Sequence, residues 1–487
     1  MKILFATSEC VPFVKTGGLA DVLGSLPKAL KQLDPTLDVR VVLPLYEDIP
    51  QKYRDAMRFI GSKYVPLGYK NNYCGVFAFD LEGITYYFLD NEFFFKRGGL
   101  YGFFDDGERF AFFSKAVLES MQVTGFYPDV LHVNDWQTAI APLFLDAFYR
   151  LTDGYKTMKT VLSVHNIEFQ GRMDKYCIDH IFGLSGRFYS EAEYKGDTNM
   201  LKAGIEASNK VITVSPSYAE EILYPYYSYG LENILNARKF KLSGIVNGID
   251  LEKNNPENNK NIVPPFSVND SDLEAKKKAN KDEVLKILGL ETDTKKEVPL
   301  IAMITRLTHQ KGIDLFIAAH HEILKQDVKI VVLGTGEWKY ESALREIEAT
   351  YPAKFKAVLS FQPNLSDKIY AGSDFFLMPS KFEPCGLSQM LAMRYGSVPI
   401  VRETGGLKDT VVPYVSATKE GNGFTFKTFD AYDMLDAVKR AVANYVAVDK
   451  TSKSYLDRIT VRKNAMTADF SWTKSAKKYL EEYKSII

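Results

Sequence analysis

The sequence is poor in cysteine and has no excess of either charge. Its 487 residues include four scattered cysteines and no Cys-x-x-Cys pair: Cys10, Cys74, Cys177 and Cys385. This spacing fits neither a disulfide framework nor a zinc site, and it is typical of a reducing compartment. Lysine plus arginine equals aspartate plus glutamate, at 61 each, so no overall field attracts nucleic acid. An anionic ligand therefore needs a local positive pocket.

Long apolar runs are missing as well. No segment approaches the roughly 20 apolar residues that a membrane helix requires. The first apolar run, from Ile3 to Ala6, starts almost at Met1, and Glu9 follows closely. This pattern indicates a strand rather than a signal peptide. We therefore expect a cytoplasmic protein that binds neither membranes nor nucleic acid.

Several motifs of nucleotide and hydrolase chemistry are absent or incomplete. There is no Walker A sequence and no Gly-x-Ser-x-Gly elbow. Gly334-Thr335-Gly336 is half of a dinucleotide fingerprint, because Lys339 replaces the third glycine, although Gly334 can still approach a nucleotide. Asp270-Ser271-Asp272 matches a metal-binding Asp-x-Asp pattern, but a lysine-rich helix follows it, which favours helix capping. We expect no metal and no cofactor.

Short β-branched runs alternate with longer helical patterns, which predicts parallel α/β architecture. In the first half, the expected strands are 3–7, 39–43, 130–133, 160–164 and 211–214, and the expected helices are 20–33, 107–121, 137–149 and 198–207. From about 60 to 90, Tyr and Phe alternate around turn residues, which predicts strands joined by short turns and attached to the first sheet, with antiparallel pairing as one option.

Residues 252–282 interrupt this rhythm. They are rich in Asn, Lys, Asp and Pro, which makes them the best candidate for a domain connection. Strands are expected again at 300–304, 330–333, 357–361, 375–378 and 398–401. The predicted fold class is α/β, with two Rossmann-like doubly wound domains facing one another across a cleft. In such sheets, ligands lie at the carboxyl ends of the strands.

The loop after the first strand carries Lys15-Thr16-Gly17-Gly18-Leu19-Ala20-Asp21. Adjacent glycines allow close approach of a ligand, and a helix start presents free N–H groups, so a phosphate or diphosphate suits this loop. The alternative, equally weighted on local features, is a tight turn with a solvated Lys15 and with Asp21 as a favourable first-turn charge.

A second cationic loop follows the expected strand 300–304. Arg306 and Lys311 are five positions apart, a spacing that suits a clamp on a diphosphate and stabilisation of a departing nucleotide. The alternative is an exposed pair at a helix start, which is the commoner case for an isolated instance. The next motif makes that alternative less favourable.

That motif is Pro379-Ser380-Lys381-Phe382-Glu383-Pro384-Cys385-Gly386-Leu387-Ser388-Gln389, after the expected strand 375–378. Glu383 lies between Phe382 and Pro384, where an unpaired carboxylate would be costly to bury. Sugar hydroxyls would satisfy it, and pairing with Lys381 is the structural alternative. The N–H groups of Gly386, Leu387 and Ser388 suit an anion or a sugar hydroxyl.

Two further strand ends lie in the first half. One carries His132 and Asp135, and the other carries His165 and Asn166. A lone histidine is usually structural, but Asp135, His165 and Asn166 at adjacent strand ends would form a polar wall suited to sugar hydroxyls. Among the abundant aromatic residues, Tyr101 in a glycine-rich loop is the one expected to contact substrate.

Together, these motifs resemble the glycogen and starch synthase family of retaining glucosyltransferases, whose fold is of the GT-B type. The resemblance covers essentially the whole chain. Its most specific stretches are KTGGLAD at 15–21, HNIEFQG at 165–171, VNGID at 246–250, TRLTHQKG at 305–312, PSKFEPCGLSQ at 379–389 and TGGLKDTV at 404–411. It implies an N-terminal Rossmann-like, acceptor-side domain at 1–245, a C-terminal Rossmann-like, nucleotide-sugar domain at 246–465, and a C-terminal helix at 466–487 that crosses back to the first domain.

The resemblance also implies roles for residues of these motifs. Lys15, Arg306 and Lys311 would hold the donor diphosphate, and Glu383, His165 and Asp135 would contact the donor glucose. With the loop analysis, the expected catalytic residues are Lys15, His165, Arg306, Lys311 and Glu383, and the expected substrate-binding residues are Gly17, Gly18, Asp21, Tyr101, Asp135, Asn166, Asn247, Gly334, Cys385, Gly386, Leu387, Ser388, Thr404, Gly405 and Gly406.

The reaction that the resemblance implies is transfer of glucose from ADP-glucose to the non-reducing end of glycogen or another α-1,4-glucan, with retention of configuration. The acceptor hydroxyl attacks on the face that the nucleotide leaves, and domain closure excludes water. Two alternatives stay open. One is a related glucosyltransferase that uses UDP-glucose, and the other is a non-catalytic glucan- or nucleotide-binding protein on the same fold.

Overall fold

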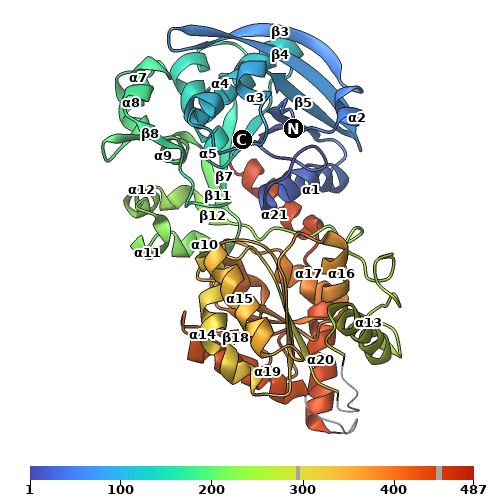
Figure 1. Cartoon of the computed structure of the whole chain (residues 1–487). Helices are drawn as coiled ribbons and strands as arrows, with labels where there is room; N and C mark the ends of the chain where they lie inside the picture. The colour runs from blue at the N-terminus through green and yellow to red at the C-terminus, as the bar shows by residue number, and fades with distance from the viewer. Residues whose placement is uncertain (292–296, 446–451) are drawn as a thin grey trace. The chain divides into compact units, whose positions relative to one another are not determined.

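The computed structural model describes residues 1–291, 297–445 and 452–487. The chain divides into two compact units (Figure 1): one contains Met1–Gly248 and Trp472–Ile487, and the other contains Ile249–Ser471. The last helix, α21 (Trp472–Lys484), therefore belongs to the first unit although it follows the second in sequence. Across the described ranges, none of the helices is long and apolar enough to span a membrane.

The first unit is built on a nine-stranded sheet with the order β12-β11-β7-β6-β1-β2-β5-β4-β3. It is parallel from β12 to β5, and β4 and β3 are added antiparallel. The strands are β1 (Lys2–Ala6), β2 (Asp38–Pro44), β3 (Arg58–Leu67), β4 (Lys70–Leu81), β5 (Ile84–Asp90), β6 (Val130–Asn134), β7 (Lys159–Val164), β11 (Lys210–Thr213) and β12 (Leu242–Gly244). The five strands expected in this half are confirmed, as are the antiparallel strands between 60 and 90.

Helices α1 (Gly18–Leu33) and α21 pack together on this unit (Figure 1), and α4 (Asp106–Thr124), α5 (Trp136–Ala139) and α9 (Met200–Ala207) form a second group of packed helices. His132 of β6 ties α21 to the sheet. Its Nδ1 lies 2.7 Å from the Tyr483 hydroxyl, and its Nε2 lies 2.7 Å from Ser163 Oγ. This buried histidine therefore has a structural role.

The remaining elements of the first unit are short. They are α2 (Gln51–Arg54), α3 (Glu92–Phe95), α6 (Ala141–Phe144), η1 (Leu145–Tyr149), β8 (Arg172–Asp174), α7 (Tyr176–His180), α8 (Arg187–Ala192), β9 (Glu193–Tyr194), β10 (Asp197–Asn199), α10 (Pro216–Glu221), α11 (Pro225–Ser228), α12 (Glu232–Ala237) and η2 (Lys239–Lys241). Two expected helices are corrected. The helix at 137–149 is three short pieces, and that at 198–207 begins at Met200 because Thr198 pairs with Met173 in a three-stranded sheet.

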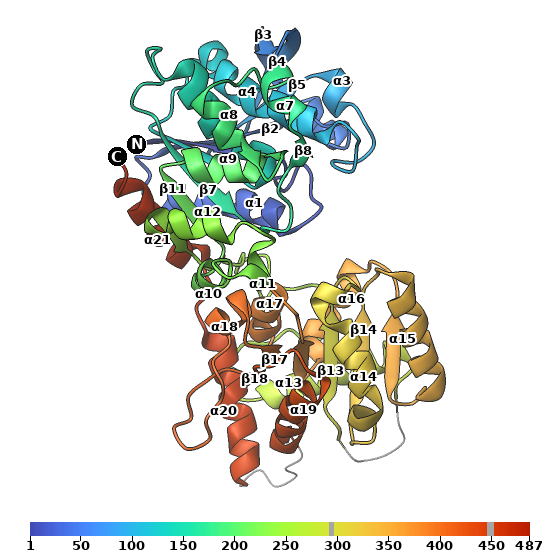
Figure 2. The ribbon, with the colours of Figure 1, turned by 90° about the vertical axis from the view of Figure 1, so that its left-hand side faces the viewer.

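The second unit holds a six-stranded parallel sheet with the order β15-β14-β13-β16-β17-β18 (Figure 2). Its strands are β13 (Leu300–Ile304), β14 (Lys329–Leu333), β15 (Phe355–Val358), β16 (Phe375–Met378), β17 (Val398–Arg402) and β18 (Phe424–Phe426). Four of the expected strands are confirmed. The strand expected at 357–361 begins two residues earlier, because the fully buried Phe355 pairs with Ile330.

Helices surround this second sheet. They are α13 (Leu273–Leu288), η3 (His309–Lys311), α14 (Ile313–Leu324), α15 (Trp338–Thr350), α16 (Pro363–Gly372), α17 (Ser388–Arg394), α18 (Gly405–Thr410), α19 (Ala431–Tyr445) and α20 (Lys453–Thr467). Helix α14 packs against both α15 and α19 beside the apolar core of the unit, whereas α13, α16, α17 and α20 form a second packed group. The polar segment at 252–282 therefore ends in a helix, α13.

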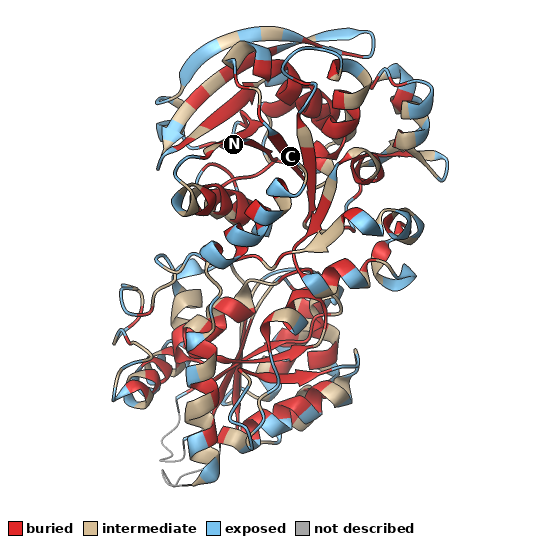
Figure 3. Ribbon diagram, turned by 180° about the vertical axis from the view of Figure 1, so that it is seen from behind, coloured by how far each residue is buried: buried red, intermediate tan, exposed pale blue. Residues whose placement is uncertain are grey.

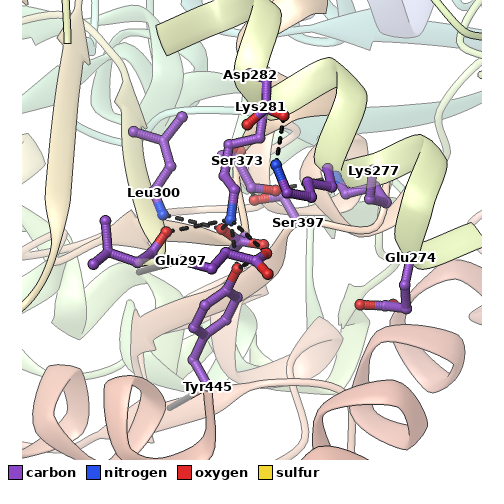
Figure 4. Close-up of polar contacts among 12 residues, drawn as sticks. Glu274, Lys277, Lys281, Asp282, Glu297, Leu300, Ser373, Ser397 and Tyr445 are labelled. Atoms are coloured by element: carbon purple, nitrogen blue, oxygen red, sulfur yellow. Dashed lines mark hydrogen bonds and ion pairs between the residues drawn. The ribbon is translucent and has the colours of Figure 1, made fainter. Parts of the chain in front are cut away.

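A buried charge cluster lies at the amino ends of β13 and β16 (Figure 4). Asp374 accepts hydrogen bonds from Lys281 Nζ at 3.1 Å, from the Leu300 N–H at 3.0 Å and from Arg462 at 3.0 Å. Lys277, also buried, donates to three backbone carbonyls. Burial alone would raise the pKa of Asp374, but Lys281 and Arg462 outweigh it and hold the pKa below its usual value. The cluster joins α13 and α20 to the sheet, at the edge opposite to the carboxyl ends of the strands.

Candidate active site

Two loops meet at the carboxyl edge of the second sheet, one after β13 and one after β16. The Lys381 N–H donates to the Gln310 carbonyl at 2.8 Å, which joins them. Gly312 is required at their closest approach. Its φ is +70°, and a Cβ there would lie 2.0 Å from the Pro379 carbonyl oxygen. The loops expected to bind a ligand are therefore brought side by side by backbone contacts.

The centre of this edge is an ion pair between two of the predicted catalytic residues. Lys311 Nζ lies 2.6 Å from Glu383 Oε2, and Ser380 Oγ donates to the same oxygen at 3.0 Å. The side chains are 15% and 8% exposed, so both charges are largely removed from water. The partner of Glu383 is thus Lys311 and not Lys381, whose Nζ lies 3.2 Å from His309 Nε2.

Arg306 lies in the same loop but is exposed. Within the described part of the chain, its guanidinium makes no hydrogen bond or ion pair. Next to it, the Leu307 N–H donates to the Thr335 carbonyl at 2.9 Å, and a Cβ on Gly334 would lie 1.8 Å from the Thr305 carbonyl oxygen. The Gly334 turn and the Arg306 loop are therefore in direct backbone contact, with the arginine head available to an anion.

The predicted turn 404–406 packs against the backbone of the Glu383 loop. The Gly406 N–H donates to the Glu383 carbonyl at 3.0 Å, and a Cβ on Gly405 would lie 2.1 Å from that oxygen. Thr404 and Cys385 are buried beside them. The structure thus brings 383–388 and 404–406 together, in a packing that tolerates no side chain at 405.

Gln389 holds the loop 385–388 in place. Its Nε2 donates to the carbonyls of Cys385 at 3.1 Å and Gly386 at 3.0 Å. Leu387 is the residue before α17, and no side chain caps that helix. The Gln389 Oε1 is buried and has no hydrogen-bond partner among the residues that the structure describes.

In the first unit, Glu9 organises the glycine loop after β1. Its carboxylate accepts hydrogen bonds from the Thr16 N–H at 2.5 Å, the Gly17 N–H at 3.1 Å and the Tyr101 hydroxyl at 2.8 Å. The Tyr101 hydroxyl also lies 2.8 Å from Ser8 Oγ. The N–H groups of Thr16 and Gly17 are therefore already bonded, and Tyr101 positions this loop through its hydroxyl.

The glycine loop also contains an exposed ion pair and an open space beside Gly17. Lys15 pairs with Asp21 at 2.6 Å, and their side chains are 49% and 29% exposed, so this pair is open to exchange with another ion. A Cβ built on Gly17 meets nothing within 4 Å, and α1 begins at Gly18 without a side-chain cap. Space for a ligand and a free helix start therefore coincide here.

Asp135 joins the ends of β6 and β7. Its Oδ1 accepts the His165 N–H at 2.7 Å and the Asn166 N–H at 3.4 Å, while its own φ is +55°. Such a backbone is uncommon outside glycine, and it is held here by the surrounding packing. The His165 Nε2 lies 3.0 Å from Asn134 Oδ1, and burial lowers the pKa of His165 to about 4. The expected grouping of Asp135, His165 and Asn166 is confirmed, with His165 neutral.

The buried Asp135 carboxyl should make the stability of the first unit depend on pH. Burial raises its pKa to about 7, against about 3.9 in an unfolded chain, so the folded state holds a proton that the unfolded state loses. The contribution of Asp135 to the free energy of unfolding of the first unit should therefore fall as the pH rises from about 4 to about 7. Asp135→Asn should remove this component, as measured by thermal unfolding across that range. Equal pH slopes in both proteins would contradict the assignment.

Asn247 is buried in the first unit, and its Oδ1 lacks a hydrogen-bond partner in the described ranges. An orphaned acceptor of this kind is costly unless a donor arrives, which suits the predicted contact with a ligand hydroxyl.

The Asp-x-Asp segment does not behave as expected. Asp272 precedes α13, but its side chain makes no capping bond, and Asp270 instead pairs with Lys276 at 2.9 Å. Over the residues that the structure covers, no three His, Cys, Asp or Glu side chains form a group that could hold a metal ion.

Comparison with known proteins shows to which family the chain belongs. Residues 2–237 match the model of the starch synthase catalytic domain, and residues 291–455 match that of glycosyl transferases group 1. The chain is 46% identical to a glycogen synthase of Anoxybacillus flavithermus, over 100% of this chain and 98% of that one. It belongs to the starch and glycogen synthase family.

Other members of the family agree with this placement. A glycogen synthase of Clostridioides difficile is 45% identical, with full coverage of both chains. The solved catalytic domain of starch synthase IV from Arabidopsis thaliana, bound to ADP and acarbose, is 33% identical, with a TM-score of 0.88 over 100% of this chain and 99% of that one. The predicted fold class, a GT-B fold of two Rossmann-like units, is confirmed, and the chain is a glycosyltransferase enzyme.

Sequence reasoning missed the residues that hold the site residues in place: Glu9, Asn134, Ser380 and Gln389. Glu9 could have been identified from the sequence, because a carboxylate that closely follows a buried strand needs hydrogen-bond partners. The other three are ordinary polar residues in the sequence, and their contacts come only from the fold.

Proposed function

We propose that this enzyme transfers glucose from ADP-glucose to the non-reducing end of glycogen or a similar α-1,4-glucan, with retention of configuration. The observation that carries the proposal is the buried Lys311–Glu383 pair beside the exposed Arg306, at the carboxyl edge of a Rossmann-like sheet. The names of the relatives, glycogen synthases from several bacteria, support the acceptor, and the ADP in the solved starch synthase supports the donor.

The pair suits a nucleotide sugar, because each partner has a different substrate group to bind. Phosphate oxygens would take Lys311 and Arg306, the latter in a bidentate manner, and glucose hydroxyls would donate to the Glu383 carboxylate. Binding would then separate the two charges without leaving either one buried and unpaired. The Ser380 hydroxyl bond keeps Glu383 oriented during this exchange.

In the proposed reaction, the bond between glucose C1 and the phosphate oxygen breaks as the acceptor oxygen bonds to C1 on the same face. The acceptor proton passes to the departing phosphate, so no side-chain base is needed. Arg306 and Lys311 stabilise the charge that develops on the diphosphate. Lys15 and His165 keep their predicted roles, at the phosphate and at the glucose, and the neutral state of His165 suits hydrogen bonding to a sugar hydroxyl.

We further propose that the reaction takes place in the cytoplasm, consistent with four free cysteines, and that it requires no metal or cofactor. A UDP-glucose enzyme and a non-catalytic binding protein are the alternatives, and one experiment separates them.

The experiment measures release of nucleoside diphosphate by the purified protein with glycogen, comparing ADP-glucose with UDP-glucose at equal concentrations. We expect faster release with ADP-glucose, matched by growth of glucan chains that an α-1,4-specific amylase degrades. A preference for UDP-glucose would overturn the donor. Release without chain growth would overturn the acceptor, and no release with either donor would leave the binding-protein alternative.

A further inference from the structure

The hairpin β3–β4 forms one edge of the first sheet and carries an aromatic face. In the antiparallel register, Tyr64 lies opposite Tyr73, and Phe59 lies opposite Phe77. The ring centroids of these two pairs are 6.4 Å and 5.2 Å apart, both edge-to-face. The two pairs are four residues apart on β4, or roughly 13 Å along the strand.

This face of the hairpin is open, although its other face is packed. Phe59, Tyr64 and Tyr73 are 58%, 66% and 41% exposed, and Figure 3 shows much of this sheet edge in the exposed and intermediate colours. The alternate residues Val65 and Val76 are buried, on the side where α4 packs against β3. Packing against the core therefore explains the apolar residues on one face of the hairpin only, and the aromatic rings lie on the other face.

The composition of the face indicates its ligand. Ser62 and Gly75 lie opposite each other between the two ring pairs, and the Tyr73 side chain leans over Gly75, where a Cβ would lie 2.8 Å from the Tyr73 hydroxyl. The charged pairs Arg58–Asp80, at 3.0 Å, and Lys63–Glu119, at 2.6 Å, involve hairpin positions that alternate with the rings. The carboxylate on the aromatic face is that of Asp90, which pairs with Gly75 from β5, where a Cβ on Gly75 would lie 3.3 Å from the Asp90 Cβ. Rings beside a carboxyl group do not suit nucleic acid or anionic lipid, and they suit an uncharged ligand that has both C–H faces and hydroxyl donors.

Pairing of this edge with a second copy is disfavoured by the strand itself. Pro66 in β3 has no N–H to donate, and a register shift between Phe59 and Gly61 breaks the ladder. These are devices by which edge strands avoid joining other chains. The rings, not the backbone edge, are the binding groups.

We propose that the aromatic face of β3–β4, made by Phe59, Tyr64, Tyr73 and Phe77, is a second α-glucan-binding surface, separate from the candidate active site. The inference rests on the proposed function, which supplies a polymer with many chain ends and many glucose residues on one particle. Rings spaced along the hairpin stack on the C–H faces of glucose units, and they hold the particle while another chain of the same polymer is extended.

The test uses the full-length double variant Phe59→Ala/Tyr64→Ala, whose side chains are largely exposed and whose folding is checked by circular dichroism. We expect KM for glycogen to rise about fivefold or more. KM for maltopentaose, KM for the donor and kcat should stay unchanged, because a short acceptor reaches only the active site. Tyr69→Ala, in the turn of the same hairpin and 81% exposed, is the matched control and should behave as wild type.

Two results would overturn the proposal: an unchanged KM for glycogen, or an equal rise in KM for glycogen and maltopentaose. A change of oligomeric state in the double variant, seen by size-exclusion chromatography, would identify the face as a protein interface instead. Affinity electrophoresis in gels containing glycogen tests binding without catalysis. If wild type turned over no donor, the proposed function would fail, while weaker retardation of the double variant would still support the surface.

Discussion

Lys311→Ala should lower kcat by about 10²–10³ while leaving the protein folded, because it removes a charge that stabilises the departing diphosphate in a largely dry site. Glu383→Ala should have a comparable effect through the loss of a hydroxyl acceptor for glucose. Lys311 and Glu383 are each other's partners at 2.6 Å, so each single change also leaves one buried charge unpaired. Steady-state release of ADP with glycogen measures the catalytic effect, and thermal unfolding measures the structural one.

Two controls separate catalysis from stability. Lys381→Ala changes a lysine of the adjoining loop that bonds His309 instead, and it should keep kcat within about threefold of wild type. The double variant Lys311→Met/Glu383→Gln removes both charges together, so it should regain stability but not turnover. Near-normal turnover in Lys311→Ala or Glu383→Ala would disprove the site assignment.

Asp374→Ala should destabilise the second unit by about 1–3 kcal/mol, because Lys281 and Arg462 would lose their shared buried counter-ion and keep only the more exposed Glu297 and Glu274. The pKa of Asp374 is lowered in the folded state, so its contribution is present above the unfolded pKa and is lost as the pH falls below it. Hydrogen exchange of peptides that span β13 and β16 reports on this unit alone.

The matched control is Asp282→Ala on the same helix, α13. Asp282 pairs with Lys278 at 2.6 Å (Figure 4), but both side chains are about half exposed, so little stability should be lost. If exchange rates in Asp374→Ala equalled those of wild type, the cluster would not stabilise the unit.

Much of the fold could be predicted because its signals are local. Short apolar runs such as Leu300–Ile304 predict buried strands wherever they occur, and the adjacent glycines at 17–18 and 405–406 mark sharp turns. Errors arose where a tertiary contact overrides the local pattern. Phe355 joins β15 by pairing with Ile330, and Thr198 leaves its expected helix to pair with Met173.

The sequence by itself determined the α/β class, most of the order of strands and helices, and the family, and it proposed the loops of the candidate site. Only the tertiary structure decided which side chains are partners. Lys311 and Glu383 are 72 residues apart, and Asp374 is 93 residues from Lys281. Local periodicity sets which residues point inward, whereas strand order and helix packing bring distant residues together. The partners of Glu383, Asp135 and Glu9 therefore become visible only in the folded chain.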